Sequence, residues 1–428
     1  MRKIFIAILI LAIHFPAKTQ NTYYPPISQT AFWDTLSPST QGWCSDSINS
    51  LYQYLAKENS KAFILLMDGK IVLEKYFGTF TKDSVWYWAS AGKTLTSFLI
   101  GKAREEGKLA LTDKTSDYLG SGWSSLTQAQ EDAITIKNQI TMTSGLDDGV
   151  PDNHCTLKSC LLYKAAPDSR WAYHNAPYTL LDKVIETATG STMNLYTQQK
   201  ISSKTGINGL WFTSGYDNVF ASKARNFARW GLLAQNGFKW NGVQLLDTAY
   251  ARQSVNTSQN MNQSYGYLWW LNGKASYMIP TSQFVFPGYF IPNAPKDMFA
   301  AIGKNGQIAS VSPSRKLVWI RMGDVPSGQL GEVPFLLADK VWSRINTLTC
   351  NSNANHAVQA KQTGVYPNPA TNYLYVLTAG QYIVTEITGK TVQTVRADIN
   401  KGIDVSNLKP GVYLLNGPNG NFRFVKQP

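Results

Sequence analysis

A serine and a lysine three residues apart, at the start of a helix that follows a β-hairpin, constrain this chain more than any other feature. Two apolar runs, 63–67 and 71–77, flank an Asp-Gly turn, which is the pattern of two antiparallel strands. A helical pattern then covers 90–106 and ends before a glycine. Ser90 and Lys93 therefore share one helical turn, where a serine nucleophile and a lysine base can meet without a histidine.

The four-residue pattern is not specific by itself. Ser406 and Lys409 have the same spacing, but the Pro-Gly pair that follows them breaks a helix. At Ser90 the alternative is a helix cap followed by a surface lysine. Other parts of a site are needed to decide between these interpretations.

Length, charge and the N-terminus set the class of protein. A chain of 428 residues with 43% hydrophobic side chains predicts a large globular domain and a smaller module. The formal net charge is +13, but no basic run exceeds two residues, so we expect no nucleic-acid partner. Residues 1–19 carry two basic residues and then an apolar core, which predicts a signal peptide. No later segment is long and apolar enough for a membrane-spanning helix.

The four cysteines fit an oxidising compartment. Cys155 and Cys160 are candidates for a small disulfide ring, and Cys44 and Cys350 are candidates for a bond between the ends of the main domain. His154 is interpreted as a polar loop residue. Outside the signal peptide only three histidines occur and they show no ligand spacing, so we expect no metal and no cofactor.

A second motif supplies a phenol and an amide. Tyr173 and Asn175 flank a histidine about eighty residues after Ser90, just before a helical pattern at 178–189. The chain has no G-x-S-x-G elbow and few histidines, which favours a lysine base over a Ser-His-Asp triad. The same Tyr-x-Asn spacing occurs at Tyr216 and at Tyr366, so each such tyrosine alone is interpreted as a packing residue.

A third motif places a cation near the edge of a strand. Lys304 lies between the apolar run 298–302 and a strand pattern at 308–311, and Gly306 beside it would let a substrate approach the backbone. The alternative is a plain hairpin turn.

In this order the motifs resemble the serine β-lactamase and penicillin-binding-protein superfamily. The resemblance covers residues 60–347 and points to the class C-like branch of β-lactamases, D-alanyl-D-alanine carboxypeptidases and carboxylesterases. It implies an α+β fold in the broad α/β class. Helices at 45–57 and 334–345 would flank a β-lactamase-like antiparallel sheet, with a helical subdomain inserted between its strands.

The resemblance also implies roles for the site residues. Ser90 would be the acyl-accepting nucleophile, Lys93 its activating partner and Tyr173 the proton relay to the leaving group. Whether the lysine or the tyrosine is the general base stays open. The remaining expectations are substrate orientation by Asn175, substrate contacts at Lys304 and Gly306, and an oxyanion hole made by the N–H groups of Ser90 and Gln307.

The third motif also bears on the substrate. β-Lactamases and peptidases of this superfamily usually show K-T-G or H-x-G there, and Asn305 replaces the hydroxyl that helps to hold a carboxylate. A literal Lys204-Thr205-Gly206 follows Tyr173 too closely to supply that strand. Gly303-x-x-Gly306-Gln307, with Trp269 and Trp270 upstream, resembles the esterase and amide-hydrolase members, including relatives of 6-aminohexanoate-dimer hydrolase. The two tryptophans either line an acyl pocket or pack in the core.

These features predict a secreted serine hydrolase that acts on a small ester, amide or peptide, most simply a carboxylesterase or small-amide hydrolase. The alternative is a β-lactamase, a D-alanyl-D-alanine carboxypeptidase or a penicillin-binding sensor that acylates and does not turn over.

The end of the chain predicts a separate module. Residues 20–349 form the expected hydrolase domain, 350–363 a polar linker and 364–428 a small β-sandwich of short alternating strands. The segments Y-P-N-P-A and G-V-Y-L resemble the C-terminal sorting domain of the type IX secretion system of Bacteroidetes. That resemblance implies the secretion machinery as a partner, and release or attachment at the cell surface. The alternative is a carbohydrate-binding or spacer domain.

Overall fold

The protein is described here by a computed structural model that covers residues 22–327, 333–350, 365–376, 378–398, 402–418 and 420–427. The expected signal peptide, 1–19, and the linker residues 351–363 lie outside the described residues. Among the described residues no helix is long and apolar enough to cross a membrane.

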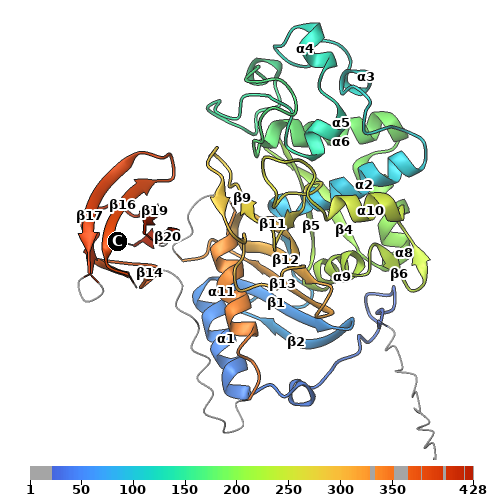
Figure 1. Ribbon diagram of the computed structural model, residues 1–428. Helices are drawn as coiled ribbons and strands as arrows, with labels where there is room; N and C mark the ends of the chain where they lie inside the picture. The colour runs from blue at the N-terminus through green and yellow to red at the C-terminus, as the bar shows by residue number, and fades with distance from the viewer. Residues whose placement is uncertain are drawn as a thin grey trace, which may run out of the picture.

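The centre of the main domain is a six-stranded antiparallel sheet (Figure 1). The expected hairpin is present, since β1 pairs with β2 across the Asp68-Gly69 turn. β2 is one of the two edge strands of the sheet. The last strand of the domain, β13, returns to pair with β1, so residues 250 positions apart in the chain share a register. The strand order is β2 (Lys70–Tyr76), β1 (Ser60–Met67), β13 (Leu317–Gly323), β12 (Gln307–Ser312), β11 (Phe299–Gly303) and β8 (Trp270–Leu271).

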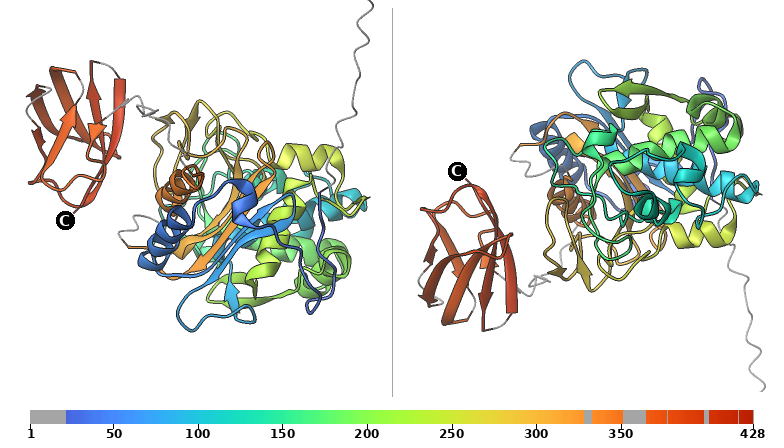
Figure 2. Two further views of the ribbon diagram at one scale, coloured as in Figure 1. Left: turned by 90° about the horizontal axis from the view of Figure 1, so that it is seen from below. Right: turned by 90° about the horizontal axis from the view of Figure 1, so that it is seen from above.

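Helices cover both faces of this sheet. α1 (Ser45–Lys57) and α11 (Phe335–Ile345) lie side by side on one face, as expected from the sequence (Figure 2). Trp342 of α11 anchors that layer, because its indole N–H donates to Ser310 Oγ of β12 at 3.0 Å. On the opposite face α9 (Ala224–Gln235) packs closely, with Gly231 against the side chains of β12 and β13.

The helical part lies above the sheet in Figure 1 and contains the two helices that matter most for the site. α2 (Lys93–Glu105) is buried along nearly its whole length. α6 (Asn175–Thr189) begins three residues earlier than its apolar pattern suggests, because Pro177 falls in its first turn, where a missing N–H costs no helical hydrogen bond. The other helices are α3 (Ser116–Leu119), α4 (Gln128–Asp132), α5 (Ile136–Ile140), α7 (Met193–Thr197), α8 (Ser203–Thr205) and α10 (Thr248–Ser254).

Small strand groups complete the main domain. β5 (Asp217–Lys223) lies between β3 (Val85–Tyr87) and β4 (Gly209–Ser214), and it borders the turn that carries Ser90. Two two-stranded pairs are formed by β6 (Lys239–Trp240) with β7 (Val243–Gln244) and by β9 (Ser276–Tyr277) with β10 (Phe286–Pro287).

The C-terminal segment forms the expected small β-sandwich. Its two sheets have the orders β14-β15-β18 and β17-β16-β19-β20, and they enclose a hydrophobic cluster that includes Leu374, Val384, Leu415 and Phe424. The strands are β14 (Val365–Tyr366), β15 (Tyr373–Val376), β16 (Gly380–Glu386), β17 (Thr391–Ala397), β18 (Ile403–Asp404), β19 (Gly411–Gly417) and β20 (Gly420–Lys426).

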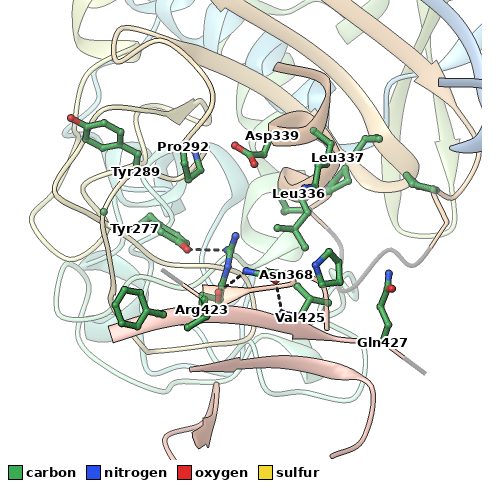
Figure 3. A pocket seen from close by; sticks show the side chains of 18 of the residues that line it. Tyr277, Tyr289, Pro292, Leu336, Leu337, Asp339, Asn368, Arg423, Val425 and Gln427 are labelled. Atoms are coloured by element: carbon green, nitrogen blue, oxygen red, sulfur yellow. Dashed lines mark hydrogen bonds between the residues drawn. The ribbon is translucent and has the colours of Figure 1, made fainter. Parts of the chain in front are cut away.

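The sandwich contacts the main domain through β20 and through Leu414 of β19. Arg423 donates to the hydroxyl of Tyr277 at 2.9 Å and its guanidinium lies 4.7 Å from the centre of the Phe335 ring (Figure 3). A cavity of about 700 Å³ lies beside this contact, lined by residues of both parts, among them Tyr289, Leu337 and Asn368. Ser90 and Lys93 do not line it.

Candidate active site

Ser90 lies in a tight 3₁₀ turn, Ala89–Gly92, that runs directly into α2. Ala89 has φ +47°, a left-handed conformation that non-glycine residues seldom adopt and that often marks functional turns. The turn is tied to β5, because the Trp88 N–H donates to the Phe220 carbonyl at 2.8 Å. Trp88, Ala91 and Gly92 are buried while Ser90 is partly exposed, so its hydroxyl is presented at the surface of a rigid turn.

Lys93 is buried at the start of α2. The residue is 3% exposed, and Nζ donates to Asn175 Oδ1 at 2.8 Å. The same nitrogen lies 3.8 Å from the ring centre of Tyr178 and 5.4 Å from that of Tyr173. An amide oxygen and two aromatic faces therefore surround the cation.

Tyr173 lies in an aromatic cluster beside Lys93. Its ring stacks on Trp270 at 5.6 Å between centroids and meets the edge of Tyr265 at 6.2 Å. Burial raises the pKa of Tyr178 and of Tyr265 well above the usual value, so both phenols stay protonated. These two neighbours therefore cannot act as bases near neutral pH.

The two adjacent tryptophans have different places. Trp270 stacks on Tyr173 and on Phe290, so it supports the ring of the candidate relay residue. Trp269 is fully buried and packs against Trp230 and Phe299, away from that ring. This is the split that strand alternation produces, with successive side chains on opposite faces.

The strand segment that touches Ser90 ends at Gly303. A Cβ at Gly303 would lie 3.0 Å from Ser90 N and 2.8 Å from Ala91 N, and it would also collide with the Trp88 carbonyl oxygen. Only glycine fits there without moving backbone. The end of β11 therefore borders the serine turn, and Ala301 and Ile302 precede the glycine on that strand.

The other residues of the expected third motif lie beyond this point. Lys304 is exposed, in the turn after β11, and Asn305 Nδ2 donates to the Tyr87 hydroxyl at 2.7 Å. Gly306 packs against the guanidinium of Arg321, so a side chain there would meet Arg321 instead of Ser90. Gln307 is fully buried, and its amide bonds both the N–H and the C=O of Gly323. The packing thus brings Gly303 directly against the serine turn.

Asn175 connects Lys93 to a polar network that the sequence did not reveal. Its Nδ2 lies 3.0 Å from Asn153 Oδ1 and 3.1 Å from His154 Nε2. His154 Nδ1 lies 2.7 Å from Asp217 Oδ2. Burial alone would raise the pKa of Asp217, but its hydrogen bond with His154 and the charge of Lys93 lower that pKa below its usual range.

Two further buried groups have displaced pKa values. Burial lowers the pKa of His174 to about 4, so its imidazole is neutral at physiological pH. Burial raises the pKa of Asp182 to about 8, against the opposing effects of Asn218 and the Lys93 charge. Asp182 is therefore largely protonated at neutral pH.

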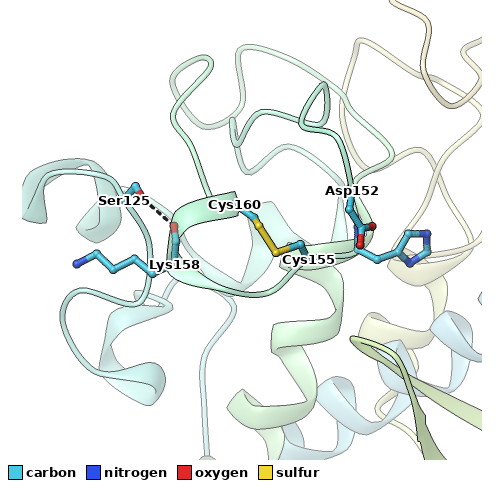
Figure 4. The surroundings of a disulfide bond; sticks show 6 residues. Ser125, Asp152, Cys155, Lys158 and Cys160 are labelled. Carbon is cyan, nitrogen blue, oxygen red and sulfur yellow. Dashed lines mark hydrogen bonds between the residues drawn. A yellow bond between two sulfur atoms is a disulfide. The ribbon is translucent and has the colours of Figure 1, made fainter.

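Both expected disulfides are present. Cys44 and Cys350 have Cα atoms 5.0 Å apart and join the start of α1 to the residues after α11. Cys155 and Cys160 have Cα atoms 5.9 Å apart and close the loop next to His154 (Figure 4). Among the described residues no cysteine is free and no cluster of potential metal ligands occurs.

Sequence reasoning named Gly303 only as part of a family-like stretch and did not place it against the serine, and it gave no role in the candidate site to His154 or Asp217. Gly303 had a usable signal, since it ends an apolar strand pattern directly before the expected motif. His154 and Asp217 had no signal of this kind, because they lie 63 positions apart and meet only through the fold.

Comparisons with known proteins support the expected family. A family model described as Beta-lactamase matches residues 53–326, and one described as Secretion system C-terminal sorting domain matches residues 364–427. The second match indicates export through the type IX secretion system to the cell surface or the medium.

Individual relatives are distant. The β-lactamase of Escherichia coli K12 is 27% identical over 158 residues, which are 35% of this chain and 39% of that protein. The chain spans about two fifths of the length of the curated relatives that it matches.

Solved structures share the fold. A Bacillus anthracis protein assigned as a 6-aminohexanoate-dimer hydrolase has TM-score 0.56 and 18% identity, covering 76% of this chain and 88% of its own. A penicillin-binding protein from Bacillus halodurans has TM-score 0.52 and 16% identity, covering 70% and 99%. A family VIII carboxylesterase has TM-score 0.53 and 13% identity, covering 71% and 99%.

Proposed function

The chain belongs to the β-lactamase family, and on that premise we propose that it is an exported serine hydrolase that forms an acyl-enzyme on Ser90. The observation that carries the proposal is the pairing of a partly exposed serine, on a strained turn, with a lysine buried one helical turn away. A cap serine with a surface lysine would not bury the lysine to 3% exposure.

The chemistry follows from these positions. Ser90 Oγ attacks the acyl carbon while its proton passes to Lys93 or Tyr173, and the relay then protonates the leaving group as its bond to the acyl carbon breaks. Water hydrolyses the resulting ester on Ser90 by the reverse sequence of proton transfers. Asn175 holds Lys93 in place through its amide oxygen.

The oxyanion hole combines the Ser90 N–H with a backbone N–H at the end of β11, at Gly303-Lys304. The close approach of Gly303 to Ser90 supports this assignment over the Gln307 N–H expected from the sequence.

The preferred substrate is a small ester or amide without a carboxylate. Strand β11, which borders the serine, carries only apolar residues and glycine from Phe299 to Gly303. The lysine of the third motif, Lys304, is exposed and lies beyond the end of the strand. That lysine keeps a β-lactamase, a D-alanyl-D-alanine carboxypeptidase or a penicillin-binding sensor as the second candidate.

The test compares two acyl donors on the purified protein. We expect steady turnover of p-nitrophenyl butyrate and no lasting mass increase after exposure to a penicillin. Ser90→Ala should lower kcat/KM for the ester by about 10,000-fold. Ser406→Ala removes the serine of the second Ser-x-x-Lys pattern and serves as the matched control, with unchanged rates.

Three other outcomes are informative. A persistent Ser90-dependent penicillin adduct would assign the protein to the second candidate. Equal ester turnover by parent and Ser90→Ala would remove Ser90 from the chemistry. A loss of turnover on Ser406→Ala equal to that on Ser90→Ala would mean that the assay reports folding.

A further inference from the structure

Asn175 is held from two sides, and the contacts set the orientation of its amide. Lys93 Nζ donates to the atom of Asn175 that lies 2.8 Å away, and protonated Nζ carries only donors, so that atom is the amide oxygen. The Nδ2 group then points outward, with one N–H toward Asn153 Oδ1 at 3.0 Å and the other toward His154 Nε2 at 3.1 Å. Both hydrogens of Nδ2 are therefore engaged by the loop.

This orientation sets the protonation state of His154. Since Asn175 Nδ2 is a donor, His154 Nε2 must offer a lone pair. The ring proton then lies on Nδ1, which is 2.7 Å from the carboxylate of Asp217. Asp217 is in turn reached by Thr179 Oγ1 of α6 at 3.4 Å. A chain of polar contacts thus runs from β5 through the imidazole and the amide to the buried lysine.

The loop that carries His154 is attached firmly at both ends. The His154 N–H donates to Asp152 Oδ1 at 3.0 Å, and the Asn153 carbonyl accepts the Ala176 N–H at the start of α6 at 2.9 Å. The disulfide between Cys155 and Cys160 closes the loop immediately after the histidine (Figure 4). A loop with these constraints can hold an imidazole at a defined distance from Asn175.

We propose that His154 is a positioning residue of the hydrolase, which holds Asn175 and through it Lys93, and that protonation of its Nε2 releases Asn175 and slows acyl transfer. The proposal rests on the proposed function and adds a means of acid regulation to the same site. Nε2 of His154 now accepts a hydrogen bond from Asn175 Nδ2. An N–H at Nε2 would face the N–H of Asn175, so this contact would become repulsive.

The charges around His154 act in both directions. Asp217 from β5 and Asp152 from its own loop favour the protonated ring, while Lys93 from α2 and His174 at the start of α6 oppose it when they are charged. Burial lowers the pKa of His174 to about 4, so between pH 5 and 8 that residue is mainly neutral. Between pH 5 and 8, changes in rate therefore do not report the protonation of His174.

The experiment measures kcat and KM for p-nitrophenyl butyrate between pH 5 and 8 in the parent and three variants. His154→Phe should lower kcat by about 30-fold across the range with KM changed less than about threefold, because the base is misplaced while substrate contacts remain. His154→Gln keeps a donor and an acceptor but cannot be protonated, so it should restore kcat to within about fivefold of the parent. Leu157→Ala changes an exposed side chain of the same loop and is the matched control.

The pH profile separates positioning from simple structural support. On the acid side, log kcat of the parent should fall with a slope approaching two, since the general base and His154 both gain protons. His154→Gln should retain a slope of one. A parent slope retained in His154→Gln, or His154→Phe within twofold of the parent, would overturn the inference.

A spectroscopic measurement keeps the inference distinct from the proposed function. ¹⁵N NMR of labelled histidine in the full protein should show the Nδ1–H tautomer for His154 at pH 7.5. An Nε2–H tautomer would overturn the inference whether or not the parent hydrolyses esters. Absence of ester turnover by the parent would count against the proposed function alone.

Discussion

At the scale of single residues, the serine turn depends on one glycine from a distant strand. Gly303 is 213 positions from Ser90 in the chain, yet its Cα faces the backbone of the serine turn with no room for a methyl group. This contact sets how close β11 comes to Ser90, the proposed nucleophile.

Replacing Gly303 by alanine tests that contact. The new methyl group would meet three backbone atoms of the serine turn, so the turn or the strand must move. We expect Gly303→Ala to lower kcat for ester hydrolysis by about 100-fold and the free energy of unfolding by about 1–3 kcal/mol. Enzyme kinetics and urea unfolding measure the two effects.

Gly92→Ala is the matched control on the same turn. A Cβ there would lie 3.7 Å from Phe220 Cβ, which is an ordinary contact, and φ is −62°. The activity should stay within about twofold and the stability should hold or rise by about 0.4–1 kcal/mol. Parent-like kcat in Gly303→Ala would remove β11 from the oxyanion hole.

At the scale of elements, the two disulfides have different tasks. Cys44–Cys350 joins the beginning of α1 to the end of the main domain, 306 positions away, and so closes the layer of helices that covers one face of the sheet. Cys155–Cys160 spans five positions and constrains only the loop beside Asn175. A long bridge constrains the unfolded chain more than a short one does.

Replacing both cysteines of one disulfide by serine should therefore affect mainly stability at Cys44–Cys350 and mainly activity at Cys155–Cys160. Cys44→Ser with Cys350→Ser should lower the free energy of unfolding by about 2–4 kcal/mol and leave kcat at 25 °C unchanged. Cys155→Ser with Cys160→Ser should lower kcat by about tenfold, because the loop that holds His154 gains freedom, with a smaller loss of stability. Thermal unfolding and ester kinetics on both variants provide the comparison, and the reverse assignment would contradict it.

At the scale of the whole molecule, the chain combines a hydrolase fold with an export module. The strands of the C-terminal sandwich pair among themselves and enclose a hydrophobic cluster of their own. Its contact with the main domain includes the bond from Arg423 to Tyr277 and the burial of Leu414 against the main core. Ser90 and Lys93 are not among the residues that line the cavity beside this contact.

A chain that stops after residue 350 should keep the hydrolase fold and lose export. We expect kcat within about twofold of the full chain, since the sandwich supplies no residue to the serine site. The truncated protein should remain inside the cell, because the sorting domain is absent. Activity assays and fractionation of cells and medium test both statements, with Arg423→Ala in the full chain as the control for the contact alone. A truncated chain that unfolds would contradict the division into two folding units.

Much of the fold was readable from local sequence because it rests on local patterns. Family resemblance predicted the helices that the structure shows as α1 and α11, whereas apolar runs on both sides of an Asp-Gly turn predicted the hairpin of β1 and β2. The helix that carries Lys93 and the sandwich at the end of the chain followed from the same kind of signal. The pairing of β13 with β1 did not, because no local pattern names a strand partner about 250 positions away.

What the sequence alone determined is the set of chemical groups: Ser90 and Lys93 one helical turn apart, Tyr173 and Asn175 at the start of a helix, and four cysteines in an exported chain. Their short spacings on regular elements make their geometry predictable. The tertiary structure decided which distant backbone meets the serine and which groups hold the amide. Gly303 meets the serine turn and His154 meets Asp217, because strand register and loop closure depend on packing across the whole domain, which no local pattern specifies.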